Sequence, residues 1–171
     1  MINSISIIFP VYNEAQRLKS CFKDIDKFNS TTKIKNIEYI FIDDGSSDKS
    51  LNLISNFLLK KKNYKNKIKY KIIRNIKNQG KGAALKKGVN IATKEWILTI
   101  DTDISVSLSE CNRWIRNNYL KNKYKIFFGS RNLKKSNVTY KLHRKFIGAV
   151  LILILQIFFK IKLHDTQCGF K

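Results

Sequence analysis

The chain has 171 residues, of which 43% are apolar and 12% aromatic, with one proline and seven glycines. This composition provides enough apolar surface for one folded domain and excludes disordered, collagen-like and low-complexity chains. The formal net charge of +22 predicts attraction to polyanions, such as an anionic membrane, phosphorylated substrates or nucleic acid. The alternative is that a coding bias toward Lys, Asn and Ile produced the charge without selection for any partner.

The cysteines and the N-terminus indicate a reducing compartment. Cys21, Cys111 and Cys168 form no C-x-x-C pair, so we expect thiols rather than a disulfide framework or a zinc site. The chain leads almost directly into the apolar run 5–9, without the pattern of a secretory signal peptide. Both features favour a cytoplasmic location.

Short apolar runs alternate with stretches whose apolar residues recur at helical spacing. The runs 5–9, 37–42, 68–73, 96–100 and 124–128 are expected strands, and 14–28, 48–59, 82–92 and 108–120 are expected helices. This alternation predicts βαβ units and an α/β fold, with a mostly parallel central sheet flanked by helices. We see no linker and expect a single domain over 1–171.

The segment 146–159 is apolar except for Gly148 and Gln156, and basic residues flank it on both sides. A helix needs about 20 apolar residues to span a bilayer, so this one is too short. We expect a basic-flanked apolar helix over 143–162, either buried in the core or lying in a membrane interface.

Ligands of open α/β sheets bind beyond the carboxyl ends of the strands. The residues that follow the five expected strands are therefore the candidates for function. In every case they include acidic, basic or glycine residues, at 10–14, 43–48, 78–82, 101–103 and 129–131. This coincidence is the main functional signal of the sequence.

Asp101 and Asp103 follow the fourth expected strand. In an extended segment, residues i and i+2 point to the same face, so both carboxylates can converge on one hard cation. Two carboxylates on Mg²⁺ or Mn²⁺ leave coordination sites for diphosphate oxygens, and the cation would neutralise charge on a diphosphate leaving group. The alternative is a solvated turn in which Asp103 caps the next helix.

Asp43 and Asp44 follow the second expected strand, where a carboxylate could accept hydrogen bonds from a base edge or a ribose. The alternative is a turn with Ser46 or Ser47 as a helix N-cap. The segment Gly80-Lys81-Gly82 has neither the P-loop spacing nor the G-x-G-x-x-G pattern. It is consistent with a helix N-terminus that, together with its lysine, suits an anionic ligand.

Taken together, these segments resemble the inverting glycosyltransferases of family 2, which have the GT-A fold. The matching segments are 9–14, 42–48, 78–84, 101–103 and 129–131, in the order and at the spacing of the family. The C-terminal D-T-Q-C-G-F-K at 165–171 resembles the closing motif of the polyprenyl-phosphate branch, and it is most similar to that of the dolichyl-phosphate β-glucosyltransferases.

The resemblance implies roles for residues on the donor side. The residues implied to hold the nucleotide are Pro10, Tyr12, Glu14 and either Asp43 or Asp44, with Lys81 near the donor. Asp101 and Asp103 would bind Mg²⁺ or Mn²⁺ and the donor diphosphate, with Asp103 the more direct ligand.

On the acceptor side, the resemblance implies that Arg131, with His143 or Arg144, meets the acceptor phosphate, since guanidinium groups suit phosphate oxygens. A phosphate acceptor is already ionised and needs no strong base, so catalysis would rest on alignment and leaving-group neutralisation. Asp165 would position the acceptor or act as a base. Its alternative role is that of a turn carboxylate near Lys162.

The function implied is transfer of a hexose to a polyprenyl or dolichyl phosphate, by a peripheral protein on the cytoplasmic side of a membrane. UDP-glucose is the favoured donor, and GDP-mannose is possible. One alternative is a family 2 enzyme with a glycan hydroxyl acceptor, which would need Asp165 as base. Another is a non-catalytic nucleotide-sugar-binding remnant, since the chain stops directly after the closing motif. Nucleic acid is not an expected partner, because no recognition motif is present.

Overall fold

The computed structural model describes residues 2–61, 68–120, 126–130 and 168–171, and the fold is given for these residues. The elements in chain order are β1 Ser4–Val11, α1 Ala15–Thr31, β2 Asn36–Asp43, α2 Ser50–Lys61, β3 Ile68–Arg74, α3 Lys81–Ile91, β4 Trp96–Thr99 and α4 Ser109–Arg116. They confirm the first four expected strands and the four expected helices. The chain divides into two compact units, 1–123 and 124–171, and all of these elements belong to the first.

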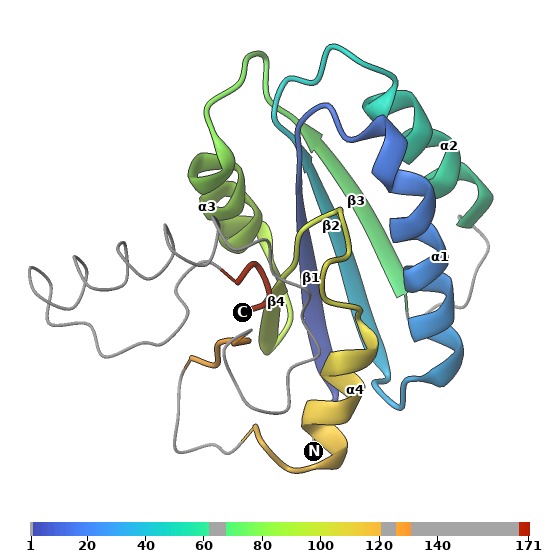
Figure 1. The fold of residues 1–171 in the computed structure, drawn as a ribbon, viewed down its shortest axis with the longest axis vertical. Helices are drawn as coiled ribbons and strands as arrows, with labels where there is room; N and C mark the ends of the chain where they lie inside the picture. Colours follow the sequence, from blue (N-terminus) through green and yellow to red (C-terminus); the bar gives the residue numbers. More distant parts are fainter. Residues whose placement is uncertain (1, 62–67, 121–125, 131–167) are drawn as a thin grey trace, which may run out of the picture. The chain divides into compact units, whose positions relative to one another are not determined.

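The four strands form one sheet in the order β3-β2-β1-β4, and every neighbouring pair is parallel. The expected parallel sheet is therefore confirmed. The chain moves outward from β1 through β2 to β3 and then returns to the other side of β1 as β4 (Figure 1). This reversal places a crevice between the carboxyl ends of β1 and β4, the position at which open α/β sheets bind ligands.

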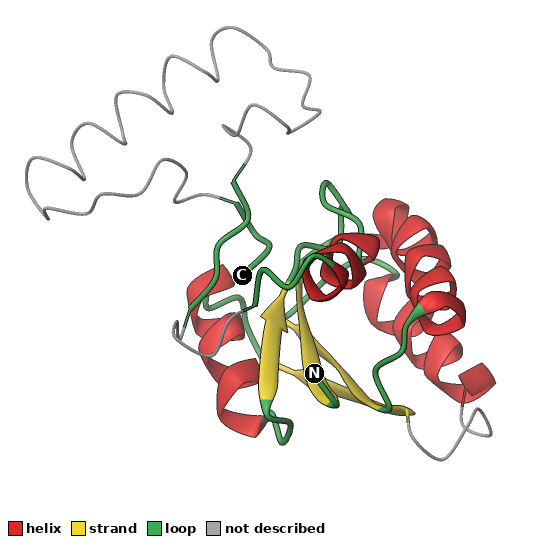
Figure 2. Ribbon diagram, turned by 90° about the horizontal axis from the view of Figure 1, so that it is seen from below, coloured by secondary structure: helices red, strands yellow, loops and turns green. Residues whose placement is uncertain are grey.

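Helices cover both faces of the sheet: α1 and α2 lie on one face and α3 on the other (Figures 1 and 2). The face under α1 and α2 is aromatic. The rings of Phe9 and Phe41 stack with centroids 4.9 Å apart, and Phe22 of α1 stacks on Phe57 of α2 at 4.1 Å. The alternation of side chains along each strand separates this layer from the aliphatic residues beneath α3.

The aliphatic layer holds α3 close to the sheet. Ile8, Ile40, Ile42 and Ala84 form a fully buried cluster there. A Cβ atom at Gly88 of α3 would lie 2.5 Å from Cγ2 of Ile8. Only glycine therefore allows the helix to lie this close to the sheet. The close packing fixes the position of α3 and hence of its first residue.

A buried carboxylate joins the strands at their amino ends, away from the crevice. Glu38 of β2 accepts a 2.6 Å hydrogen bond from the Ser6 hydroxyl and forms a 2.7 Å ion pair with Lys71; Thr93 donates through its N–H and its hydroxyl. Burial alone would raise the pKa of Glu38, but these partners lower it to about 2. Glu38 is therefore an ionised structural residue.

Two of the three cysteines lie on helices and are buried in the core. Cys21 of α1 and Cys111 of α4 are both buried. Burial raises the pKa of both thiols, that of Cys111 to about 12. These two side chains act as small core residues.

α4 is shorter than the expected helix 108–120. It ends at Arg116 because Asn118 takes a left-handed conformation with φ +55°. The N–H groups of Asn118 and Tyr119 then bond to the carbonyls of Ile115 and Trp114, which is the Schellman arrangement of a helix C-terminus. Asparagine is the residue that tolerates this position best after glycine.

The expected strand 124–128 is not found in its described part, because residues 126–130 have no ladder partner. Instead, the Gly129 N–H donates a 2.9 Å hydrogen bond to the carbonyl of Phe170. Among the described residues, none of the helices has the length and apolar character to cross a bilayer. The expected apolar helix at 143–162 lies outside the described residues, so it stays a prediction. The single domain over 1–171 also stays a prediction.

Candidate active site

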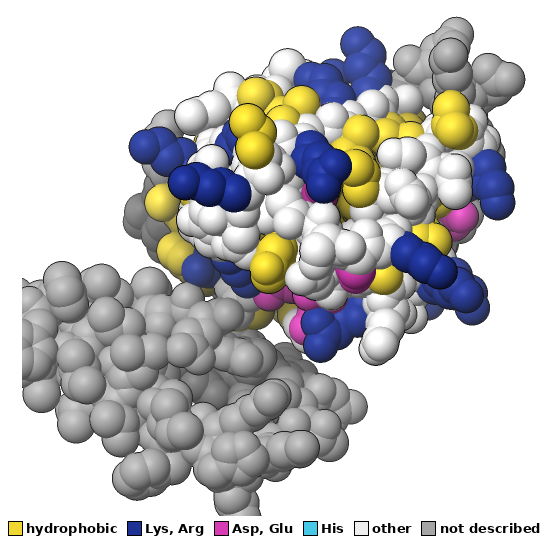
Figure 3. Space-filling view, turned by 90° about the horizontal axis from the view of Figure 1, so that it is seen from above, with side chains coloured by type: hydrophobic (Ala, Val, Ile, Leu, Met, Phe, Trp, Pro, Cys, Tyr) yellow, Lys and Arg dark blue, Asp and Glu magenta, His cyan; other side chains and the backbone are white. Residues whose placement is uncertain are grey.

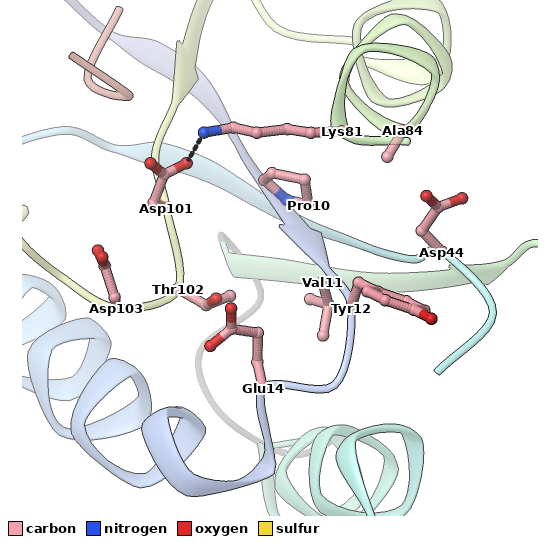
Figure 4. A pocket seen from close by; sticks show the side chains of 10 residues that line it. All are labelled: Pro10, Val11, Tyr12, Glu14, Asp44, Lys81, Ala84, Asp101, Thr102 and Asp103. Carbon is pink, nitrogen blue, oxygen red and sulfur yellow. Dashed lines mark ion pairs between the residues drawn. The ribbon is translucent and has the colours of Figure 1, made fainter. Parts of the chain in front are cut away.

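A pocket of about 300 Å³ lies at the carboxyl ends of β1 and β4, within the first unit (Figure 4). Its lining consists of Pro10, Val11, Tyr12, Glu14, Asp44, Lys81, Ala84, Asp101, Thr102 and Asp103. The structure thus brings together the residues expected on the donor side, with the exception of Asp43. Four separate segments of the chain supply them.

β1 reaches farther than expected and carries two wall residues, Pro10 and Val11, as part of the strand. The pairing with β4 ends at Ile8 and Thr99. Pro10 follows this last pair, so its missing N–H costs no ladder bond to β4. Tyr12, which follows the last residue of β1, has 48% of its surface exposed. It offers an aromatic face at the pocket for a planar ligand group.

The loop after β1 is locked to the loop after β2. Asn13 has φ +54°, and its N–H donates to Oγ of Ser46 at 3.0 Å while its Oδ1 accepts from the Ser47 N–H at 2.9 Å. Glu14 adds a bond from its N–H to Oγ of Ser50 at 2.8 Å. These bonds hold Tyr12 and Glu14 at the pocket.

Neither Ser46 nor Ser47 caps α2, so that alternative for the second loop is wrong. The side chain of Asp48 bonds to the start of α2 instead. Its Oδ1 accepts a hydrogen bond from the Ser50 N–H at 2.8 Å, and its Oδ2 accepts one from the Ala15 N–H at 3.0 Å. One carboxylate therefore serves the first residues of both α1 and α2. Hydrogen bonding lowers the pKa of Asp48, although burial opposes the shift.

Asp44 joins the pocket wall to the loop before α3. The residue is 2% exposed, and its carboxylate accepts hydrogen bonds from the side chain of Asn75 at 2.7 Å and from the N–H groups of Gln79 and Gly80. The bond from Gly80 measures 2.8 Å. Gly45 lets the loops approach, since its φ is +76° and a Cβ would lie 2.8 Å from the Lys77 carbonyl carbon.

Asp43 does not line the pocket. Its side chain is fully buried; Oδ1 accepts from the Ser46 N–H at 3.2 Å, and Oδ2 lies 3.3 Å from Nε of Arg74. Of the two carboxylates expected to hold the nucleotide, Asp44 is the one at the pocket. A nucleotide contact by Asp43 stays a prediction.

Asp101 and Asp103 both face the pocket, with the buried Thr102 between them (Figure 4). The sequence suggested that an extended segment would turn both carboxylates to the same side. The two residues are not in an extended segment, however, because β4 ends at Thr99. A turn follows, in which the Ile104 N–H bonds to the carbonyl of Asp101 at 3.2 Å and Ile104 has φ +51°. Oδ1 of Asp103 accepts from the Ser105 N–H at 2.9 Å.

The suggestion that Asp103 caps the next helix is wrong, because α4 begins only at Ser109. The carboxylate of Asp24 in α1 binds the N-terminal end of α4 instead. Its Oδ2 accepts from the Leu108 N–H at 2.7 Å, and its Oδ1 accepts from the Ser107 hydroxyl at 2.7 Å. The carboxylate of Asp103 therefore remains available to the pocket.

Two basic side chains balance the acidic lining. Lys81, the first residue of α3, places Nζ 2.6 Å from Oδ1 of Asp101 (Figure 4). Arg17 of α1 lies 2.9 Å from Glu14. The hydrogen bond to Glu14 raises the pKa of Arg17, and Asp103 adds a smaller attraction. Sequence analysis missed Arg17, although its i,i+3 spacing from Glu14 was visible.

The acidic pair suits a divalent cation that is shared with a ligand. The described residues contain no group of three or more His, Cys, Asp and Glu that could hold a metal by itself. Mg²⁺ and Mn²⁺ sites in phosphate-binding proteins use one or two carboxylates and take their other ligands from phosphate and water. Asp101 and Asp103 at the rim of one pocket fit that donor set.

In the second unit, residues 126–130 lie against 168–171. A Cβ at Gly129 would come within 2.9 Å of Sγ of Cys168 and 3.1 Å of the Phe170 carbonyl oxygen. The described residues of the motif at 129–131, Gly129 and Ser130, thus lie in the same part of the second unit as residues 168–171 of the closing motif. The other acceptor-side candidates, Arg131, His143, Arg144 and Asp165, lie outside the described residues.

The sequence model of glycosyl transferase family 2 matches residues 6–170. The chain belongs to glycosyltransferase family 2. A dolichyl-phosphate beta-glucosyltransferase of Dictyostelium discoideum is 32% identical over 178 residues, which cover 98% of this chain and 53% of that relative. This family 2 chain thus spans about half the length of the relative.

Solved structures show the same fold. S. aureus TarS 1-349 in complex with UDP matches with a TM-score of 0.54 and 21% identity, over 68% of this chain and 33% of that one. The mannosyltransferase PcManGT from Pyrobaculum calidifontis, in complex with GDP-Man and Mn²⁺, matches with a TM-score of 0.50 and 20% identity, over 58% and 27%. The family 2 chain has the expected GT-A fold.

Proposed function

We propose that this family 2 chain binds a nucleotide sugar in the pocket between β1 and β4 and transfers its hexose, with inversion, to a polyprenyl or dolichyl phosphate. The observation that carries the proposal is the convergence of Tyr12, Asp44, Lys81, Asp101 and Asp103 on one pocket. We favour UDP-glucose as the donor, and the name of the Dictyostelium relative, a dolichyl-phosphate beta-glucosyltransferase, supports glucose as the sugar. GDP-mannose is the alternative donor.

The nucleotide would lie between the loops after β1 and β2. Tyr12 offers an aromatic face for the base, and Asp44 lies on the same wall. The diphosphate would face the N-terminus of α3, where backbone N–H groups and the positive end of the helix dipole favour anions. Lys81, at this helix end, adds a full positive charge.

Asp101 and Asp103 would hold Mg²⁺ or Mn²⁺ next to this diphosphate. The cation supplies neutralisation of the charge that the departing nucleoside diphosphate carries. The residues of the chain then have to orient the donor and exclude water, because the bond from the anomeric carbon to the diphosphate breaks while one to the acceptor phosphate oxygen forms. No strong base is required for an acceptor that is already ionised.

The acceptor phosphate would be bound by Arg131 with His143 or Arg144, and Asp165 would position it. Arg131 and Asp165 belong to the two motifs whose described residues, Gly129 and Phe170, are hydrogen-bonded in the second unit, and His143 and Arg144 lie between these motifs in the sequence. The acceptor side is the part of the proposal that depends on the resemblance to the family.

We also propose peripheral attachment to the cytoplasmic side of a membrane. Lys and Arg outnumber acidic side chains on the face that holds the carboxyl ends of the strands (Figure 3), and each basic residue near an anionic surface contributes about 1 kcal/mol. Flotation with phosphatidylserine vesicles should recover the chain at low salt and release it at high salt. A chain that stays unbound at low salt would contradict this attachment.

A transfer assay tests the proposed function. The chain, radiolabelled UDP-glucose and polyprenyl phosphate in detergent should yield a labelled lipid only when Mn²⁺ or Mg²⁺ is present. Label that appears on a glycan, and not on the lipid, would favour a hydroxyl acceptor. Donor binding without transfer to either acceptor would favour the non-catalytic alternative.

A further inference from the structure

The ion pair between Lys81 and Asp101 has a position that suggests a role beyond charge balance. Nζ of Lys81 lies 2.6 Å from Oδ1 of Asp101 at the pocket. The Lys81 side chain is 53% exposed and that of Asp101 30% exposed. An exposed ion pair of this kind contributes little to folding, so its value to the protein does not lie in stability.

Both partners are fixed at their backbones. Gly80, just before Lys81, is held by Asp44, and α3 is packed closely on the sheet through Gly88. On the other side, the Ile100 N–H bonds to the carbonyl of Ile8 at 3.1 Å, directly before Asp101. The part that can move is therefore the long, half-exposed side chain of Lys81.

We propose that Lys81 is a positioning residue that occupies Asp101 until the donor diphosphate arrives. This inference rests on the proposed function. The ammonium group occupies one oxygen of a carboxylate that would bind the divalent cation, and a cation on the same carboxylate would be repelled by the ammonium charge. A nucleoside diphosphate presents anionic oxygens at the same helix end, and lysine binds phosphate as a mobile point charge. Lys81 then moves from Asp101 to the diphosphate.

The exchange makes the cation and the donor bind cooperatively. Lys81 lowers the affinity of the pocket for a divalent cation alone and raises its affinity for the diphosphate. Because coupling between two ligands is reciprocal, each then strengthens the binding of the other. The pocket would thereby take up the cation together with the donor and not before it.

Titration of Mn²⁺, followed by the electron paramagnetic resonance signal of the free ion, tests this role without any activity measurement. Without nucleotide, Lys81→Met should bind Mn²⁺ about 10-fold more tightly than the wild-type chain, a ratio within the usual range of coupling between sites. The same variant should bind UDP more weakly when no metal is present. Lys81→Arg keeps the charge and should retain the low affinity for Mn²⁺ alone.

Lys86→Met is the matched control, because Lys86 is an exposed lysine of the same helix outside the pocket lining. Circular dichroism confirms that each variant is folded. Equal Mn²⁺ affinities of Lys81→Met and Lys86→Met, with Mn²⁺ bound normally in the presence of UDP, would overturn the role of Lys81 alone. If no chain binds Mn²⁺ even with UDP, the metal assignment fails and the role of Lys81 fails with it.

Discussion

Asp44 and Gly80 lie 36 residues apart in the chain, and the Gly80 N–H donates a 2.8 Å hydrogen bond to Oδ2 of Asp44. The same carboxylate accepts from Asn75 and Gln79. A carboxylate at the end of β2 thus shapes the loop that leads into α3 and presents Lys81 to the pocket.

Asp44→Asn should therefore weaken both the fold and donor binding. The amide can accept fewer of these hydrogen bonds, and its NH₂ group would face backbone donors, so we expect a loss of about 1–3 kcal/mol in the free energy of unfolding. Urea denaturation and UDP titration measure the two effects. An unchanged midpoint would show that the loop is held in another way.

Asp103→Asn should reduce transfer without changing the stability of the fold. Within the described part of the chain, the Asp103 side chain accepts one hydrogen bond, from the nearby Ser105 N–H, so the melting temperature should not change. Transfer should fall by more than about 100-fold, because the chain loses a ligand of the cation. Asp26→Asn, an exposed carboxylate of α1 that pairs with Lys61, is the control. Normal transfer by Asp103→Asn would remove this residue from the metal site.

The pH dependence of stability should report on Glu38. The fold holds its pKa at about 2, below the value of about 4.3 in an unfolded chain. Ionised Glu38 therefore stabilises the fold fully above about pH 4.3, and this contribution is lost as the pH falls toward 2.

Glu38→Gln should cost roughly 2–4 kcal/mol at pH 7, since it leaves Lys71 and buried donors without their carboxylate. The variant should also make the free energy of unfolding depend less on pH between about pH 4.3 and 2. Denaturation at a series of pH values measures both effects. Glu95→Gln, which changes an exposed glutamate at the same end of the sheet, should leave the curve as it is; an equal response of the two variants would contradict the role of Glu38.

Two alanine substitutions in α3 should have opposite signs. Gly88→Ala would place a methyl group 2.5 Å from Ile8 and should destabilise the fold by about 1–3 kcal/mol. Gly82→Ala meets no atom within 4 Å and should stabilise the helix by up to about 1 kcal/mol. Thermal melting of both variants gives the comparison. A stable Gly88→Ala chain would mean that α3 can shift on the sheet.

Much of the fold could be predicted from sequence because its signals are local. Short β-branched runs alternate with helical spacing, and this pattern yields parallel strands whose carboxyl ends share one edge. The position of Lys81, Asp101 and Asp103 at this edge follows from that pattern. Their meeting in one pocket depends in addition on the strand order, which places β4 beside β1.

Other features depend on geometry that sequence does not display. Neighbouring residues of a strand point to opposite faces, so whether Asp43 or Asp44 meets the pocket depends on the face that β2 turns toward α3. Ile40 and Ile42 lie on that face, and Asp44 continues the alternation. The left-handed conformation of Ile104 is rare for a β-branched residue, so the turn at 101–104 left no sign in the sequence.

Calorimetric titration of UDP-glucose and GDP-mannose, with and without Mn²⁺, tests the central claim that the pocket between β1 and β4 is a metal-dependent nucleotide-sugar site. The account predicts that UDP-glucose binds, that Mn²⁺ tightens its binding by about 10-fold or more, and that Asp103→Asn removes the effect of Mn²⁺. If neither nucleotide sugar binds, with or without Mn²⁺, the claim is contradicted.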